Sequence, residues 1–136
     1  MNDALFVYGS LREGARHPMY EVLREHGTLA GPARVRGRLY VVDWYPGLVL
    51  DDAAGWVVGE LWTSIASAAW PVLDFYEGCS AEDPAPHEYV RRSAQVDVAG
   101  VWKQAWVYDY ARNVGALTMV DSGDWLERSS TKNPEG

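Results

Sequence analysis

Short apolar stretches alternate with turn residues along the chain, and most of these stretches have the length and the β-branched or aromatic character of strands. Residues 4–8 (ALFVY) form such a run, which ends at Gly9 as a buried strand does. The same criteria predict further strands over residues 34–43, 48–50, 56–63, 88–98 and 101–111. Two segments carry helix start and stop signals instead: residues 18–26 before Gly27, and a segment from Ser64 or Ser67 to Glu77 before Gly78. The predicted order is β-α-β-β-β-α-β-β.

Strands therefore outnumber helices, and short turns join most of them. This order favours an α+β fold with a strongly curved or closed sheet over a doubly wound parallel sheet. No repeat, low-complexity segment or linker divides the 136 residues, of which 48% are hydrophobic and 23% charged. We expect one domain over residues 1–128, followed by a polar, disordered tail over residues 129–136.

Charge and composition narrow the classes of partner. The chain has 12 Lys and Arg against 19 Asp and Glu, a net charge of -7, which argues against nucleic acid because phosphate contacts need basic side chains. No apolar run approaches the roughly 18–20 residues that span a bilayer. The N-terminus carries Asp3 and no basic segment, unlike a signal peptide, and the lone Cys79 has no intramolecular disulfide partner. We expect a cytoplasmic protein with no nucleic-acid or membrane partner.

The first candidate site is the turn Tyr8-Gly9-Ser10-Leu11 at the end of the first strand. Glycine lets the backbone approach a ligand closely, and successive N–H groups in such a turn can form a concavity that binds anions. The same residues also suit an ordinary strand-to-loop turn, so both interpretations stay open.

The second candidate is Glu77, which projects between Trp70 and Leu73 on the predicted helix. A carboxyl group among large apolar side chains has a raised pKa, which suits a general acid/base at neutral pH. The alternative is an exposed acid at the end of the helix. Asp74, one turn earlier, is the rival carboxylate.

Tyrosines on the last two predicted strands form the third candidate. The spacing of Tyr89, Tyr108 and Tyr110 allows all three to face one interior, where their hydroxyls could orient a polar substrate. Ordinary core packing is the alternative. Metal-ligand spacing is absent from the chain's histidines and cysteine, which are His17, His26, His87 and Cys79.

Several motifs, taken together and in order, resemble the gamma-glutamylcyclotransferase-like family. They are Tyr8-Gly9-Ser10-Leu11, Tyr45-Pro46-Gly47, LDFYEG at 73–78, YVRR at 89–92, AWVYDY at 105–110 and SGDW at 122–125. The resemblance covers residues 4–126. It implies a small mixed β-barrel with short helices packed outside, and a cavity lined by the first motif and the glutamate.

The resemblance also implies a chemistry. Enzymes of the family convert a γ-glutamyl amine or γ-glutamyl amino acid into 5-oxoproline and the free amine, through attack by the substrate's own α-amine, and need no metal or organic cofactor. Carried onto this chain, Tyr8 to Leu11 hold the γ-glutamyl part and Glu77 moves the proton. We expect Tyr89 and Tyr110 to contribute to binding the small γ-glutamyl substrate.

Two alternatives remain. One is an enzyme that trims γ-glutamyl groups from a specialised metabolite, with residues 12–17 and 79–87 setting the mouth of the pocket. The other is a binding module that keeps the pocket and does no chemistry.

Overall fold

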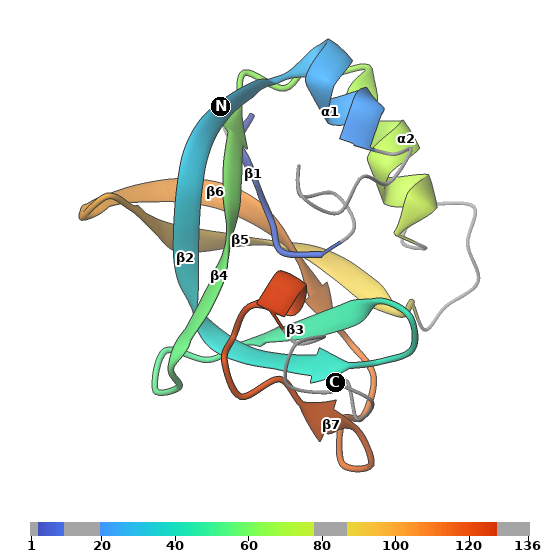
Figure 1. Cartoon of the computed structure of the whole chain (residues 1–136). Helices are drawn as coiled ribbons and strands as arrows, with labels where there is room; N and C mark the ends of the chain where they lie inside the picture. Colours follow the sequence, from blue (N-terminus) through green and yellow to red (C-terminus); the bar gives the residue numbers. More distant parts are fainter. Residues whose placement is uncertain (1–2, 10–19, 78–86, 128–136) are drawn as a thin grey trace.

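The strands of the protein close into a barrel, with two helices packed outside it (Figure 1). The computed structural model describes residues 3–9, 20–77 and 87–127. The elements are β1 (Leu5–Val7), α1 (Tyr20–His26), β2 (Thr28–Val41), β3 (Pro46–Leu50), β4 (Trp56–Thr63), α2 (Ala69–Tyr76), β5 (Tyr89–Val98), β6 (Val101–Tyr110), β7 (Thr118–Met119) and a 3-10 helix, η2 (Trp125–Glu127). The tail expected over 129–136 and the helix start expected at Pro18 lie outside the described residues.

Five strands form the closed sheet, in the order β1-β4-β2-β3-β6, and β6 returns to pair with β1. The pairs β1–β4, β2–β4 and β2–β3 are antiparallel, whereas β1–β6 and β3–β6 are parallel. β5 forms a hairpin with β6 and touches β2, and the short β7 pairs with β2. The predicted small mixed β-barrel is confirmed.

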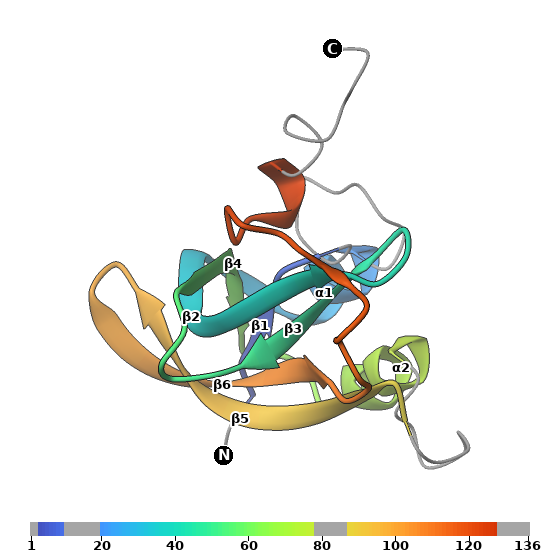
Figure 2. The same ribbon diagram turned by 90° about the horizontal axis from the view of Figure 1, so that it is seen from below.

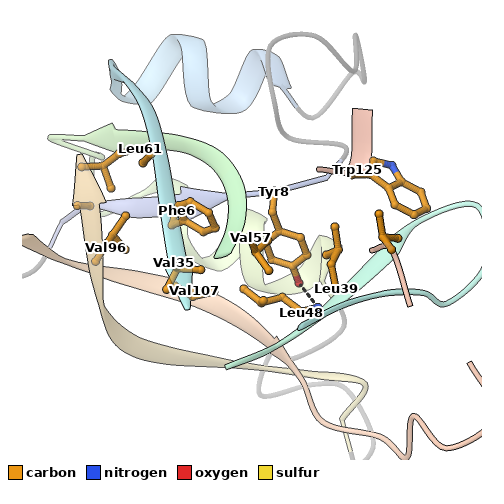
Figure 3. Packing of buried hydrophobic residues seen from close by; sticks show 14 residues of the cluster. Phe6, Tyr8, Val35, Leu39, Leu48, Val57, Leu61, Val96, Val107 and Trp125 are labelled. Atoms are coloured by element: carbon orange, nitrogen blue, oxygen red, sulfur yellow. Dashed lines mark hydrogen bonds between the residues drawn. The ribbon is translucent and has the colours of Figure 1, made fainter. Parts of the chain in front are cut away.

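Both faces of β1 are buried, which explains its uninterrupted apolar sequence. Phe6 and Tyr8 point into the barrel, where Figure 3 shows them among side chains from the surrounding strands. Leu5 and Val7 point the other way, into a second cluster that packs under the helices. One strand therefore joins the barrel interior to the layer outside it.

The second strand shows the alternation expected of a sheet with one buried face. Ala33, Val35 and Leu39 are buried, whereas the arginines between them, Arg34, Arg36 and Arg38, are exposed. At Gly37 a Cβ atom would lie 2.6 Å from the carbonyl oxygen of Val49 on β3, so only glycine allows the two strands to approach this closely.

The two helices contact each other on one side of the barrel (Figure 1). Leu23 of α1 and Leu73 of α2 are fully buried there. α2 begins after Ala68 without a side-chain cap, so the expected capping by Ser64 or Ser67 does not occur. No helix in the described ranges is long and apolar enough to cross a membrane.

Candidate active site

A cavity of about 190 Å³ lies beside the turn between β2 and β3. The ends of β1 and α2 and the start of β5 border it. Figures 1 and 2 show the end of α2, the start of β5 and this turn on one side of the barrel. The lining residues are Phe6, Val7, Tyr8, Gly9, Trp44, Tyr45, Pro46, Tyr76, Glu77, Glu88, Tyr89 and Tyr108. Five segments far apart in the sequence therefore supply one site.

Tyr8 fixes the inner wall of this cavity. Its hydroxyl donates a hydrogen bond to the carbonyl oxygen of Tyr108 at 2.6 Å and accepts one from the backbone N–H of Leu48 at 3.3 Å. Figure 3 shows the second of these bonds, from the tip of the Tyr8 side chain toward β3. Burial raises the pKa of Tyr8 well above its ordinary value, so the hydroxyl keeps its proton and its orientation.

Gly9 is required by a close contact. A Cβ atom at this position would lie 2.7 Å from Cγ of Pro46, so any larger residue would push β1 away from the β2–β3 turn. The hydroxyl of Tyr89 donates to the carbonyl oxygen of Pro46 and ties β5 to the same turn. Ser10 and Leu11, the other residues of the predicted binding turn, lie outside the described residues.

Glu77 directly follows α2, and its backbone N–H still bonds to the carbonyl oxygen of Leu73 at 3.0 Å. The residue is half-buried and lines the cavity. Burial raises the pKa of its carboxyl group to about 8, with smaller contributions from the negative charges of Glu88 and Asp74. The group can therefore release and recover a proton near neutral pH.

Asp74 has a different environment, although it lies only one turn earlier. Its two oxygens accept hydrogen bonds from Arg91 at 3.0 and 3.1 Å, and one also accepts the hydroxyl of Tyr108 at 2.7 Å. The Arg91 guanidinium lies over the rings of Trp70 and Trp106. Asp74 does not line the cavity, so of the two rival carboxylates only Glu77 can meet a ligand there.

The tyrosines divide between the cavity and its support. Tyr89 and Tyr108 line the cavity, whereas Tyr110 does not. The ring of Tyr110 packs edge-on against Tyr89, with ring centres 5.4 Å apart, and lies against Gly47. Tyr110 therefore supports the wall from behind, and the structure places it away from the substrate position expected for it.

Two lining residues of the cavity, Glu88 and Trp44, were not singled out by the sequence reasoning. Glu88 is half-buried and accepts a hydrogen bond from the hydroxyl of Tyr45 at 2.6 Å. Trp44 packs edge-on against Tyr45, with ring centres 5.0 Å apart. The motif Tyr45-Pro46-Gly47 marked this turn, but nothing in the sequence connected it to an acid 43 residues later.

The charged side chains among the described lining residues are both acidic, Glu77 and Glu88. Within the described ranges, no three His, Cys, Asp or Glu side chains come close enough together to hold a metal ion. The cavity thus offers two carboxyl groups, aromatic faces and hydroxyls that are already oriented by the protein.

The protein is thus a small mixed β-barrel with a cavity on one side. A half-buried glutamate at the end of α2 lines this cavity. The chain belongs to the gamma-glutamyl cyclotransferase, AIG2-like family, whose family model matches residues 5–127. The family expected from the sequence motifs is therefore confirmed.

Individual relatives agree with this assignment. The chain is 35% identical over 127 residues to the gamma-glutamylcyclotransferase family protein YtfP of Escherichia coli strain K12, covering 91% of this chain and 96% of that protein. The solution structure of ytfP from Escherichia coli matches with a TM-score of 0.66 at 32% identity, over 93% of this chain and 98% of that one. An AIG2-like protein from Mus musculus shares the fold, with a TM-score of 0.72 at 24% identity over 98% and 92% of the two chains.

One relative has a more specific name. The gamma-L-glutamyl-butirosin B gamma-glutamyl cyclotransferase of Niallia circulans is 31% identical over 110 residues, covering 80% of this chain and 67% of that protein.

Proposed function

We propose that the protein is a γ-glutamyl cyclotransferase, which converts a γ-glutamyl amine or γ-glutamyl amino acid into 5-oxoproline and the free amine. The observation that carries the proposal is Glu77, a cavity-lining carboxyl group whose pKa of about 8 suits proton transfer at neutral pH. Family membership and the names of the relatives support the same chemistry.

The reaction needs no protein nucleophile. The α-amine nitrogen of the substrate bonds to its own γ-carbonyl carbon and closes a five-membered ring, while the bond from that carbon to the leaving amine nitrogen breaks. Two protons leave the α-ammonium as it becomes the ring N–H, and two arrive on the leaving nitrogen, which departs as an ammonium, so atoms and charge balance. The protein therefore has to fold the substrate and move protons from one nitrogen to the other.

Glu77 suits the proton transfer on both sides of the reaction. In its ionised form it accepts a proton from the α-ammonium, and its raised pKa makes it a stronger base than an ordinary glutamate. The protonated carboxyl then delivers a proton to the leaving nitrogen.

The walls of the cavity have to hold the substrate in a bent conformation, with its α-amine beside its γ-carbonyl. Holding an amine and a carbonyl in contact can supply much of the rate, because an oriented intramolecular attack avoids the entropy cost of an encounter. Tyr8 and Tyr89 suit this task, since each is buried and each hydroxyl is held by a backbone carbonyl. The backbone at Gly9 is held against Pro46 and provides the turn on which the γ-glutamyl part would lie.

The test is incubation of the purified protein with a panel of γ-glutamyl amino acids and γ-glutamyl amines, followed by quantification of 5-oxoproline. Release of 5-oxoproline in equal amount with the free amine is expected. Binding of panel members without turnover would support the non-catalytic binding module instead. Release of free glutamate would indicate hydrolysis and overturn the cyclisation mechanism.

An enzyme that trims γ-glutamyl groups from a specialised metabolite is the second candidate. The Niallia circulans relative favours it, since its name is that of an activity on γ-L-glutamyl-butirosin B. The same panel separates the two when it includes γ-L-glutamyl-butirosin B, because turnover confined to that compound would establish the second candidate.

A further inference from the structure

We propose that Glu88, held in place by Tyr45, selects substrates whose leaving amine carries a second positive charge, such as the γ-glutamyl derivative of a diamine. This inference rests on the proposed cyclotransferase function and names the class of leaving group. Its basis is that Glu88 is a half-buried carboxylate in the cavity wall whose hydrogen-bond partner, Tyr45, is neutral. Four aspartates of the barrel have an arginine as their partner instead.

The position of Glu88 is fixed from two sides. One carboxylate oxygen accepts the Tyr45 hydroxyl at 2.6 Å, and the backbone carbonyl accepts the N–H of Ala111 at 2.8 Å. A carboxylate has two oxygens with about four acceptor sites, so this side chain keeps capacity for a ligand that donates hydrogen bonds. A fixed carboxylate recognises a cation without first losing conformational freedom.

Four aspartates elsewhere in the barrel have cationic partners. Each of four aspartates pairs with an arginine, as Asp51–Arg38, Asp74–Arg91, Asp97–Arg34 and Asp109–Arg92. Glu88 bonds to a phenol, and the described residues that line its cavity include no Arg, Lys or His. Because removal of a charge from water is costly unless the charge is paired, a bound cation would complete this site.

The surrounding residues match a cationic ligand. Trp44 lines the cavity although 61% of it is exposed, so it lies where the cavity opens to solvent. The faces of Trp and Tyr rings attract ammonium groups, most strongly when water is partly excluded. Asp43 adds negative charge within electrostatic reach of Tyr45, whereas the exposed Arg112 acts on Tyr110, outside the cavity lining.

The two cavity carboxylates would then serve different nitrogens. The α-ammonium has to lose its proton before it attacks, so it needs Glu77, which can take that proton. A second ammonium on the leaving amine keeps its charge throughout the reaction. Glu88 and the aromatic mouth can hold this permanent charge and leave Glu77 to the reacting end.

A matched pair of substrates tests the proposal: γ-glutamyl-1,5-diaminopentane, which ends in an ammonium, and γ-glutamyl-pentylamine, which has the same chain without it. We expect the full-length protein to prefer the charged substrate at least tenfold in kcat/KM. In E88Q this ratio should fall close to one, mainly through a higher KM for the charged substrate. Y45F should lower the ratio less, because it removes only the hydroxyl that positions Glu88.

D121N is the control, since it removes one negative charge from an exposed site outside the cavity lining and should keep the wild-type ratio. An unchanged ratio in folded E88Q, or no preference in the wild type, would overturn the proposal. Equal loss on both substrates would place Glu88 at the α-ammonium, which also overturns it.

Failure of the proposed function is a separate outcome, seen as no turnover of either substrate. In that case binding of 1,5-diaminopentane and of pentylamine to the wild type and E88Q, measured by calorimetry, decides the question. Tighter binding of the diamine, lost in E88Q, supports the cation site. Equal binding of both amines contradicts it.

Discussion

The carboxylates on the outside of the barrel and those in the cavity differ in what balances their charge. On the outside, Asp97 accepts a hydrogen bond from Arg34 at 2.8 Å, and this bond lowers the pKa of Asp97. In the cavity, burial raises the pKa of Glu77 to about 8, and the described lining offers it no cation. Four aspartates outside the cavity are thus paired with arginines, whereas the two acids that line the cavity have no cationic partner among its described lining residues.

The comparison extends to neighbours on one helix. Asp74 and Glu77 lie one turn apart, yet Asp74 belongs to the paired group through Arg91, whereas Glu77 belongs to the cavity. Position along the helix decides this difference, because Asp74 faces β5 and β6 while Glu77 follows the helix end. This difference supports the chemical role that we propose for Glu77 and a structural role for Asp74.

The largest expected effect is on turnover. Glu77→Gln should lower kcat at least 10²–10⁴-fold, the range typical of losing a general acid/base, because the amide can neither accept nor deliver the proton. The shape of the side chain is nearly unchanged, so substrate binding should persist. Release of 5-oxoproline from purified variants measures the loss.

Asp74→Asn is the matched control, since it makes the same chemical change one turn away. It should lower turnover far less and act mainly on stability, because it weakens the Arg91 pair and the hydrogen bond from Tyr108. Near wild-type turnover in folded Glu77→Gln, with loss only in Asp74→Asn, would transfer the role to Asp74.

A second effect should appear in stability against pH. Between the ordinary pKa of Glu and the raised value in the folded protein, the unfolded chain has lost the proton that Glu77 retains when folded. Raising the pH therefore favours unfolding, and the Glu77 contribution should fall by up to about 1.4 kcal/mol per pH unit between pH 5 and 8.

Glu77→Gln lacks this titration, so its free energy of unfolding should increase relative to that of the wild type from pH 5 to pH 8, which means that the variant becomes relatively more stable. Urea unfolding of both proteins at several pH values measures the difference. The titration of the histidines contributes equally to both proteins and therefore cancels in the comparison. A difference independent of pH would contradict the raised pKa.

The pH dependence of kcat/KM should be next in size. Glu77 has to be ionised to accept the first proton, so kcat/KM should rise about tenfold per pH unit below pH 7 and level off near pH 8. Initial rates at low substrate concentration across pH 5.5–9 give the profile. A profile already flat above pH 5.5 would exclude Glu77 as the base.

The smallest effect is expected outside the cavity. Asp97→Asn removes the charge from the part-buried pair with Arg34, but the amide oxygen can still accept a hydrogen bond from Arg34 or from the backbone N–H of Gly100. Thermal unfolding should show a small drop in Tm, and 5-oxoproline release should not change. A loss of turnover comparable to that of Glu77→Gln would remove the distinction between the two groups of acids.

Much of the fold could be predicted from sequence because the barrel strands carry simple patterns. The predicted strand over 56–63 coincides with β4, and the alternation from Arg34 onward marks the inner face of β2. The predicted strand over 34–43 left out the first six residues of β2, a stretch that contains Gly31 and Pro32 and a bulge between Leu29 and Gly31. The short β7 and η2 carry no such pattern.

The site was harder to predict, since closure of the barrel decides which residues meet. Glu77 could be found because its motif and its place at a helix end both mark it. Trp44 and Glu88 could not, because they meet only where β3 and β5 begin beside the same cavity. The spacing of Tyr110 suggested an inward hydroxyl, but its ring packs against Tyr89 and does not line the cavity.

The most direct test of the unpaired cavity acid is titration of the Glu77 carboxyl itself. In protein labelled with ¹³C on the glutamate carboxyl carbons, the resonance absent from Glu77→Gln identifies this group. Its chemical shift should change with a midpoint near pH 8, in keeping with burial beside Glu88. A midpoint near the ordinary value for glutamate, about pH 4.3, would show a solvated, unperturbed acid and contradict the account.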